Sequence, residues 1–277
     1  MTALPQGDCG DFPLRNPMKA TFPEHRQYLY DIVRLKLFFV HYWLEHHPEE
    51  TFRFVIRQRV DIYRKTDANP GLLTPTKLYF DSPEWTSLEN EAYRVYQTTI
   101  HDRAGFEEKA FQVFRPSIDA RAQRDYLDPS PLHAYQCGSL KHNPALDADG
   151  QTLDFHIGNA VCPHSIFEDP AYLPRCFASL LDKAESMGAT RIATCSWLNE
   201  NKKWLALFPP EWANEHLSAP DKNVLWHYAF WGQFISSRHT FNAKYGRILR
   251  ETGEFPFYPR FSWCTVERMR EQIAPYL

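Results

Sequence analysis

The sequence lacks the short motifs by which many catalytic sites are recognised. It contains no Gly-x-Gly-x-x-Gly, no Walker-type phosphate loop and no Gly-x-Ser-x-Gly elbow, and only 11 of its 277 residues are glycine. Dinucleotide-binding, nucleotide-binding and α/β-hydrolase functions are therefore not favoured. The chain also has no internal repeat and no low-complexity tract, so a solenoid is not indicated.

The chain has neither a strong charge of one sign nor a long hydrophobic run. Lys and Arg number 31 against 34 Asp and Glu, a formal net charge of -3, which argues against general nucleic-acid binding. Residues 1–16 lack the apolar segment of a signal peptide. The most apolar stretch, residues 28–44, contains four polar interruptions that do not suit a membrane span: Asp31, Arg34, Lys36 and His41. We therefore expect a soluble, cytoplasmic protein with no nucleic-acid and no membrane partner.

The six cysteines are spread along the chain without a Cys-x-x-Cys pair, at positions 9, 137, 162, 176, 195 and 264. A domain of this size does not need disulfides, so thiols are favoured over a disulfide framework. Cys162 and His164 form a Cys-x-His pair of a kind that suits zinc. No second convincing pair accompanies it, and we expect no metal.

The composition, 43% hydrophobic and 15% aromatic, is sufficient to fill a core. Residues 1–22 form an irregular, proline-punctuated lead. Residues 23–130 have a mainly helical pattern, with helices expected over 23–47, 48–63 and most of 84–115. Residues 116–131 form a polar connector. Residues 131–277 then form an α/β region, which we expect to be one compact unit with the helical part.

The second half predicts a strand–helix–strand unit over about 150–199. Strands are expected over 132–140, 152–159 and 191–198, and a helix over 170–187 that stops at Gly188. This order is typical of a parallel crossover. The predicted fold class is therefore α+β or α/β, with a helical N-terminal half packed on a mixed sheet. Further helices are expected over 200–208, 222–238 and 240–252, although the aromatic segment 223–235 also suits a strand.

The crossover unit predicts where chemistry would lie. In open α/β sheets, ligands bind beyond the carboxyl ends of the strands, and the two predicted strands end near His156 and Cys195. His156 is a candidate general base or acid, and Cys195 a candidate nucleophile paired with it. The alternatives are a hydrogen-bonded core histidine and an inert, packed cysteine.

Neighbouring side chains are candidates for binding a substrate. Asn159 and Asn199 follow the two strands and are suited to orienting a substrate or holding an oxyanion. The loop 160–170 adds His164 and Ser165, and aromatic walls with a polar group are expected from Trp197, Trp231 and Gln233. The alternative for the last two is a core helix, because the helical spacing of the aromatics around Trp231 already explains them.

Residues 150–208 resemble the GNAT acyltransferases in layout. The resemblance is carried by Leu153–Ile157, Leu180–Ala184, Gly188–Ile192, and Asn199 before a helix that contains Trp204. In that family a strand leads into a helix that carries the pyrophosphate of acetyl-CoA, and an Asn often follows the next strand. The family's Arg/Gln-x-x-Gly-x-Gly/Ala loop is absent, since residues 160–170 contain no glycine. The resemblance implies acyl transfer, with acyl-CoA as the donor and a role for Asn199.

The sequence thus favours a soluble enzyme that acts on a small organic substrate by acid–base or group-transfer chemistry, with no evident cofactor. One alternative is an acyl-CoA-dependent acyltransferase. The other is a non-catalytic protein that binds a small molecule or another protein. The substrate and the oligomeric state stay open at this point.

Overall fold

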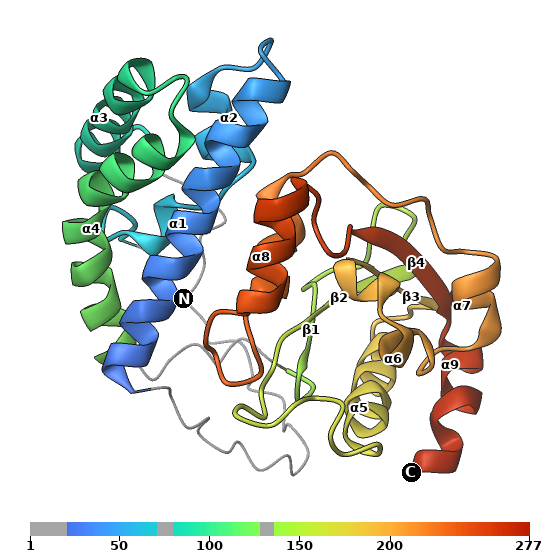
Figure 1. The fold of residues 1–277 in the computed structure, drawn as a ribbon. Coiled ribbons are helices and arrows are strands. Elements are labelled where there is room, and N and C mark those ends of the chain that lie inside the picture. Colours follow the sequence, from blue (N-terminus) through green and yellow to red (C-terminus); the bar gives the residue numbers. More distant parts are fainter. Residues whose placement is uncertain (1–20, 71–79, 128–135) are drawn as a thin grey trace, which may run out of the picture. The chain divides into compact units, whose positions relative to one another are not determined.

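The computed structural model describes residues 21–70, 80–127 and 136–277. They form helices and one mixed four-stranded sheet with a parallel pair, which confirms the α+β class (Figure 1). Within these residues, no helix has the length and apolar content needed to cross a membrane.

The chain divides into two compact units. A helical unit comprises the described residues from 21 to 127 together with Asp221–Tyr258, and a sheet unit comprises the described residues from 136 to 220 together with Pro259–Leu277. Residues 221–258 thus belong with the helices rather than with the sheet.

The helical unit begins with α1 (Phe22–His46), as the sequence predicts. Thr21 and Glu24 cap it reciprocally: the Thr21 side chain accepts from the backbone N–H of Glu24, and the Glu24 carboxylate accepts from that of Thr21. Its apolar side is buried, with Leu29, Val33 and Val40 at most 1% exposed. This burial, more than helical propensity, stabilises the helix.

Three further helices complete the bundle: α2 (Phe52–Gln58), α3 (Pro83–Thr98) and α4 (Arg103–Leu127). Ion pairs Arg34–Glu108 and Arg103–Glu45 show that α1 and α4 run antiparallel. The predicted connector 116–131 is wrong, since α4 continues to Leu127 with Pro116 inside it. Its buried residues Phe114, Ile118 and Ala122 recur at helical spacing, and their packing outweighs the cost of the internal proline.

The aromatic segment 223–235 forms neither an α-helix nor a strand. It contains two short 3-10 turns, η4 (Trp226–Tyr228) and η5 (Phe230–Phe234), separated by Ala229 with φ +53°. The helix α8 (Ala243–Thr252) follows and ends at Gly253, whose φ is +72°. A Cβ at Gly253 would lie 2.0 Å from the Tyr42 ring, so only glycine fits this stop.

The sheet unit has the strand order β1-β2-β3-β4. Its strands are β1 (Leu140–His142), β2 (Thr152–Ile157), β3 (Arg191–Ser196) and β4 (Arg260–Thr265). β2 and β3 are parallel and are joined through α5 (Tyr172–Ser186), which confirms the predicted crossover; the outer pairs are antiparallel. The predicted strand 132–140 is wrong in its placement, since β1 begins at Leu140 and residues 136–139 form a turn with an isolated bridge; residues 132–135 lie outside the described residues.

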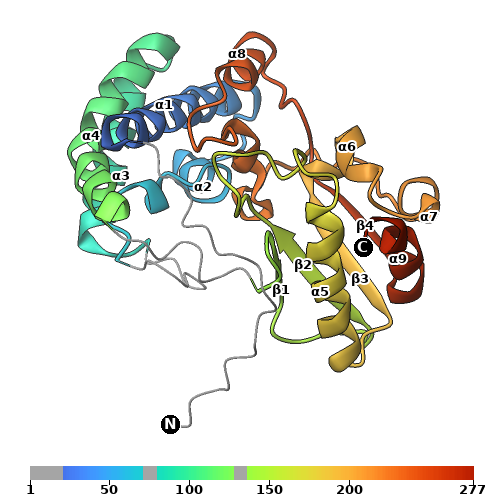
Figure 2. The ribbon, with the colours of Figure 1, turned by 90° about the horizontal axis from the view of Figure 1, so that it is seen from below.

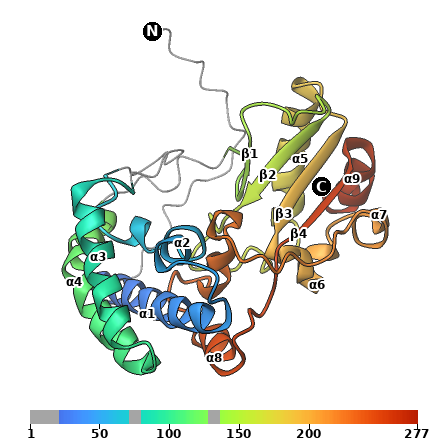
Figure 3. The ribbon, with the colours of Figure 1, turned by 90° about the horizontal axis from the view of Figure 1, so that it is seen from above.

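One face of the sheet carries the core of this unit. There α5 lies next to α9 (Val266–Ile273), and the short helices α6 (Lys202–Leu205) and α7 (Pro210–Asn214) lie towards the β4 side (Figure 2, Figure 3). Phe155 of β2 meets Phe177 of α5 edge to face at 5.6 Å, and Phe208 stacks on Trp212 at 3.8 Å. Aromatic burial on this scale dominates the stability of the unit.

Candidate functional site

The opposite face of the sheet carries polar side chains. Because successive strand residues point to opposite faces, Asp154 and His156 of β2 project away from the core that buries Leu153 and Phe155. His156 is exposed and Asp154 is partly buried. This second side of β2, which we call the polar face, is the candidate site.

The strands bring His156 and Cys195 to the same level of the polar face. Asp154 pairs with Ala193 in the parallel register, and each of the two candidate catalytic residues lies two positions further along its strand. Cys195 is exposed, as is His156. On the other side, Lys141 of β1 is the cross-strand partner of His156. The predicted proximity of His156 and Cys195 on neighbouring parallel strands thus agrees with the register.

The two parallel strands part at this level. Their ladder joins Thr152–Asp154 to Arg191–Ala193, whereas β2 continues to Ile157 and β3 to Ser196. Each strand keeps its outer antiparallel neighbour over these last residues. His156 and Cys195 therefore lie near the carboxyl ends of the parallel strands, the end at which ligands of open α/β sheets bind.

The contact of His156 with Asn143 favours one tautomer of the imidazole ring. Its Nε2 lies 3.1 Å from Oδ1 of Asn143, an oxygen that only accepts, so this contact is a hydrogen bond in the tautomer that has the proton on Nε2 and a lone pair on Nδ1. Although part of the His156 ring is exposed, its partial desolvation lowers the pKa below the ordinary 6.5, and the positive charge of Lys141 adds to the effect. The imidazole is therefore neutral at pH 7 and able to take up a proton at Nδ1.

Asp154 is a candidate that the sequence analysis missed. Burial raises its pKa from 3.8 to about 6, and the neighbouring carboxylates of Asp147 and Asp149 contribute. Its Oδ1 is buried and has no hydrogen-bond partner among the described residues. A carboxyl of raised pKa with a buried, unpaired oxygen is typical of a functional position. Strand alternation from His156 would have selected it, because the residue two positions earlier shares its face.

A cavity of about 460 Å³ lies on this face at the level of Thr152 and Arg191, the first residues of β2 and β3. Its wall includes Asp149, which accepts hydrogen bonds from the backbone N–H and the hydroxyl of Thr152. The Arg191 guanidinium lies 4.6 Å from the ring of Trp263, which also stacks on His216 at 3.6 Å. The complete lining is Asp147, Ala148, Asp149, Thr152, Arg191, Phe261 and Trp263. The cavity thus combines charged groups of both signs with aromatic surface.

Asn199 lies on the core side of the sheet rather than on the polar face. It is 0% exposed, and its Oδ1 accepts from the indole N–H groups of Trp204 at 2.9 Å and Trp212 at 3.2 Å. Its Nδ2 donates to the backbone oxygens of Thr194 and Arg260. These four bonds use the whole amide inside the fold, so we drop Asn199 from the site. Trp197 also packs, partly buried, against this core.

The candidates on the loop after β2 contact one another. Asn159 accepts from the backbone N–H of Val161 and donates to the carbonyl of His164. The His164 ring lies 3.1 Å from the Glu168 carboxylate, which also accepts from the backbone N–H of Ser165. These contacts order the loop.

Trp231 and Gln233 belong to the helical unit. The Trp231 indole donates to the carbonyl of Arg59 at 2.9 Å, and the Lys36 ammonium lies 5.3 Å from its ring. Gln233 is 1% exposed; its amide donates to the carbonyls of Phe230 and Phe257 and accepts from the N–H of Phe257. Both side chains are thus engaged in the core of their own unit.

Cys162 of the Cys-x-His pair is the residue to consider first for a metal ion. Cys162 is buried, which raises its pKa, and no three His, Cys, Asp or Glu side chains of the described segments come together to hold a metal ion.

Before α5, the Asp169 carboxylate accepts from the N–H of Ala171 and pairs with Arg175 at 2.7 Å. The chain's own negative charge therefore lies where the GNAT layout would bring a pyrophosphate.

Comparison with protein-family models, with curated proteins and with solved structures finds no match to this chain. The function is therefore inferred from the chemistry of the polar face. The residues that this face brings together are Lys141, Asn143, Asp154, His156 and Cys195, and the same face carries the cavity near the first residues of β2 and β3.

Proposed function

We propose that the protein is an enzyme that transfers protons on a small organic substrate bound at the polar face of the sheet. The observation that carries the proposal is an unpaired Asp154 carboxyl two residues from a neutral His156 imidazole on the same face. His156 takes a proton at Nδ1, and Asp154 gives or receives the second one. The cavity on the same face holds the body of the substrate.

The two groups suit this work because the pKa of the acid is raised and that of the base is lowered. The pKa of Asp154 rises to about 6, and that of His156 falls below 6.5. One group can therefore release a proton under conditions in which the other accepts one. Alternate residues of a strand stand about 7 Å apart, which leaves space for the reacting atoms of a small substrate between the side chains.

Group transfer through Cys195 is a second candidate, favoured by the exposure of this thiol at the level of His156. The thiol proton moves to Nδ1 of His156 and the sulfur attacks an acyl carbonyl. The leaving group departs with that proton, and a second nucleophile then releases the acyl group from the thioester. A CoA thioester is the less favoured donor because Glu168 and Asp169 repel a pyrophosphate before α5.

The test is conversion of an unfractionated metabolite extract by the purified protein, followed by mass spectrometry. We expect at least one metabolite to be consumed, and its turnover to fall about 100-fold or more in His156→Gln and Asp154→Asn. Asp182→Asn, an exposed carboxyl on α5, is the control and keeps full turnover. Equal turnover by the wild type and both site variants contradicts the proposal. A metabolite that is bound and never converted favours a binding protein instead. A separate thermal-shift series with CoA esters tests whether an acyl-CoA is the acyl donor of the second candidate function.

A further inference from the structure

The helical unit contains a larger cavity of its own, lined by α1, α2, α3 and the turns that follow α1 and α3. Its volume is about 840 Å³, within the range of small-molecule sites. The walls include Leu44 of α1, Phe52 and Arg53 of α2, and Tyr93 and Tyr96 of α3. All of these residues belong to the helical unit, so the cavity does not depend on the polar face of the sheet.

The carboxylates in the wall already have cations of their own. Glu50 pairs with Arg59, and Glu45 pairs with Arg103. Glu89, whose side chain is only 2% exposed, binds both Nε and NH2 of Arg57, at 2.7 and 2.8 Å. Negative charge in the cavity is therefore neutralised within the fold, and a cationic ligand would gain little from it.

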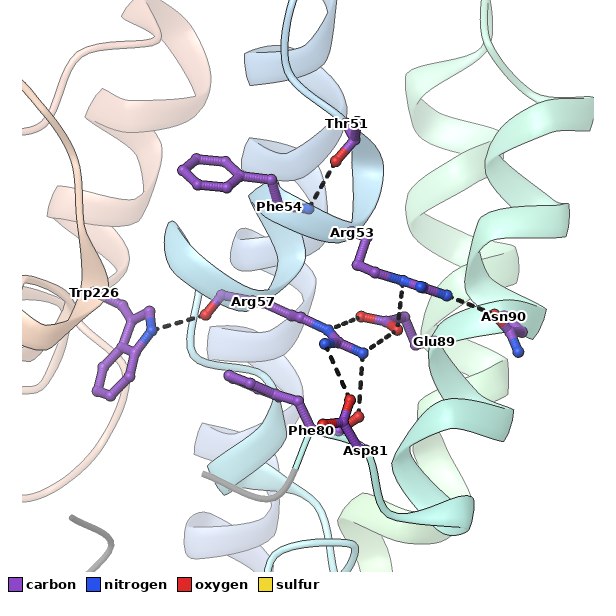
Figure 4. A network of polar contacts seen from close by, with 9 residues as sticks. All are labelled: Thr51, Arg53, Phe54, Arg57, Phe80, Asp81, Glu89, Asn90 and Trp226. Atoms are coloured by element: carbon purple, nitrogen blue, oxygen red, sulfur yellow. Dashed lines mark hydrogen bonds and ion pairs between the residues drawn. The ribbon is translucent and has the colours of Figure 1, made fainter. Parts of the chain in front are cut away.

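Arg53 is a second guanidinium group beside the Glu89 carboxylate. Its Nε lies 3.2 Å from the Glu89 carboxylate, and its NH2 donates to Oδ1 of Asn90 at 3.4 Å (Figure 4). Arg57 pairs with Asp81, at 3.6 Å, as well as with Glu89, so the two guanidinium groups meet two carboxylates, of which Asp81 is fully exposed. The Arg53 side chain is 59% exposed, so its remaining N–H groups are accessible to a ligand.

Aromatic and aliphatic surface lies beside this cation. Tyr93 is 43% and Ile100 44% exposed, although both are large apolar residues that line the cavity. The ring of Phe52 packs against both tyrosines of this surface, with its centroid 5.4 Å from those of Tyr93 and Tyr96. Apolar walls with one placed charge are typical of sites for amphipathic small molecules.

We propose that this cavity binds a small organic carboxylate with an aromatic or alkyl body. The carboxylate accepts hydrogen bonds from Arg53, and the body packs on Tyr93, Tyr96 and Ile100. Guanidinium groups suit carboxylates because both are planar and pair through two hydrogen bonds. The site is separate from the proposed acid–base site and does not require that the protein be an enzyme.

The test uses 4-phenylbutyrate and its uncharged isostere 4-phenylbutanamide, together with straight-chain carboxylates of four to ten carbons, measured by ligand-observed NMR and calorimetry. We expect a carboxylate of this panel to bind at least about tenfold more tightly than its amide, and Arg53→Gln to abolish the difference. Tyr93→Ala should weaken acid and amide alike. Arg94→Gln, an exposed arginine on α3 outside the cavity wall, is the matched control.

Circular dichroism and melting temperature verify that Arg53→Gln folds, which is expected because Glu89 retains Arg57. The proposal is overturned if acid and amide bind equally, if Arg53→Gln binds the acid as the wild type does, or if no panel member binds saturably up to about 10 mM. Binding should be unchanged in His156→Gln, so that failure of the acid–base site and failure of this one are told apart.

Discussion

Asp154 and His156 occupy alternate positions on β2, and their side chains project from the same face of the sheet with their pKa values shifted towards each other. Burial disfavours the charged form of both groups, which raises the pKa of an acid and lowers that of a base. Lys141 opposite His156 and the carboxylates beside Asp154 act in the same directions. The strand therefore brings together a carboxyl whose pKa is raised to about 6 and an imidazole whose pKa is lowered.

Asp154→Asn should stabilise the protein above about pH 6. The folded-state pKa is raised from 3.8 to about 6, so ionising Asp154 costs the folded state free energy that the unfolded chain does not lose. We expect the variant to gain about 1–2 kcal/mol near pH 8, and the gain to vanish as the pH falls through 6 to about 4. Urea denaturation at both pH values measures it.

Asp182→Asn is the matched control for this experiment, because its carboxyl is 73% exposed on α5. A gain in Asp154→Asn that is equal at both pH values would show that ionisation of Asp154 is not the cause. Stability gained together with lost turnover is the signature of a group retained for function.

Cys195 should be the first of the described cysteines to be alkylated. It is exposed, whereas Cys176 and Cys264 are fully buried and burial raises their pKa. We expect iodoacetamide to modify Cys195 at least about tenfold faster, measured by peptide mass spectrometry. If His156 accepts the thiol proton, His156→Gln slows this reaction and His164→Gln does not. Equal alkylation rates in both variants would show that His156 does not activate the Cys195 thiol, and would contradict the second candidate function.

Asn199→Ala should strongly destabilise the sheet unit. The substitution leaves the buried indole N–H groups of Trp204 and Trp212 and the carbonyls of Thr194 and Arg260 without the amide. We expect a loss of about 3–5 kcal/mol in the free energy of unfolding. Asn201→Ala, which removes only the cap at the start of α6, should cost about 1 kcal/mol. A mild effect at Asn199 would return it to the list of candidate site residues.

Gln233→Leu should destabilise the helical unit by about 2–3 kcal/mol, because the buried amide makes three hydrogen bonds to backbone atoms. Ligand binding by the remaining folded protein should be normal. Gln97→Leu, on the exposed side of α3, serves as the control. Unchanged stability with lost ligand affinity would instead assign Gln233 to a binding site.

The elements that the sequence predicted well are those whose local signals agree with their packing. The helix α1 has a capping box and a wide apolar face, and β2, α5 and β3 follow one another with clear stops such as Gly188. The parallel pairing, and with it the level shared by His156 and Cys195, followed from this order.

The errors arose where long-range packing decides the structure. Pro116 suggested a connector, but the antiparallel contact with α1 keeps α4 helical through it. No local signal distinguishes β4, which forms because Arg260–Thr265 pairs along the whole of β3. Asn199 resembled a substrate-binding residue, and only the fold reveals the two indoles that it holds. Asp154 was missed because its raised pKa depends on burial and on Asp147 and Asp149.

The most direct test of the proposed site is an NMR titration of the side-chain carboxyl carbon of Asp154 and the imidazole of His156 in the full chain. Our account predicts that Asp154 titrates near pH 6 and His156 below 6.5, with His156 in the Nε2–H tautomer at pH 7. A carboxyl that titrates near 3.8 and an imidazole that titrates at or above 6.5 would contradict the account, because neither group would then be tuned for proton transfer near neutrality.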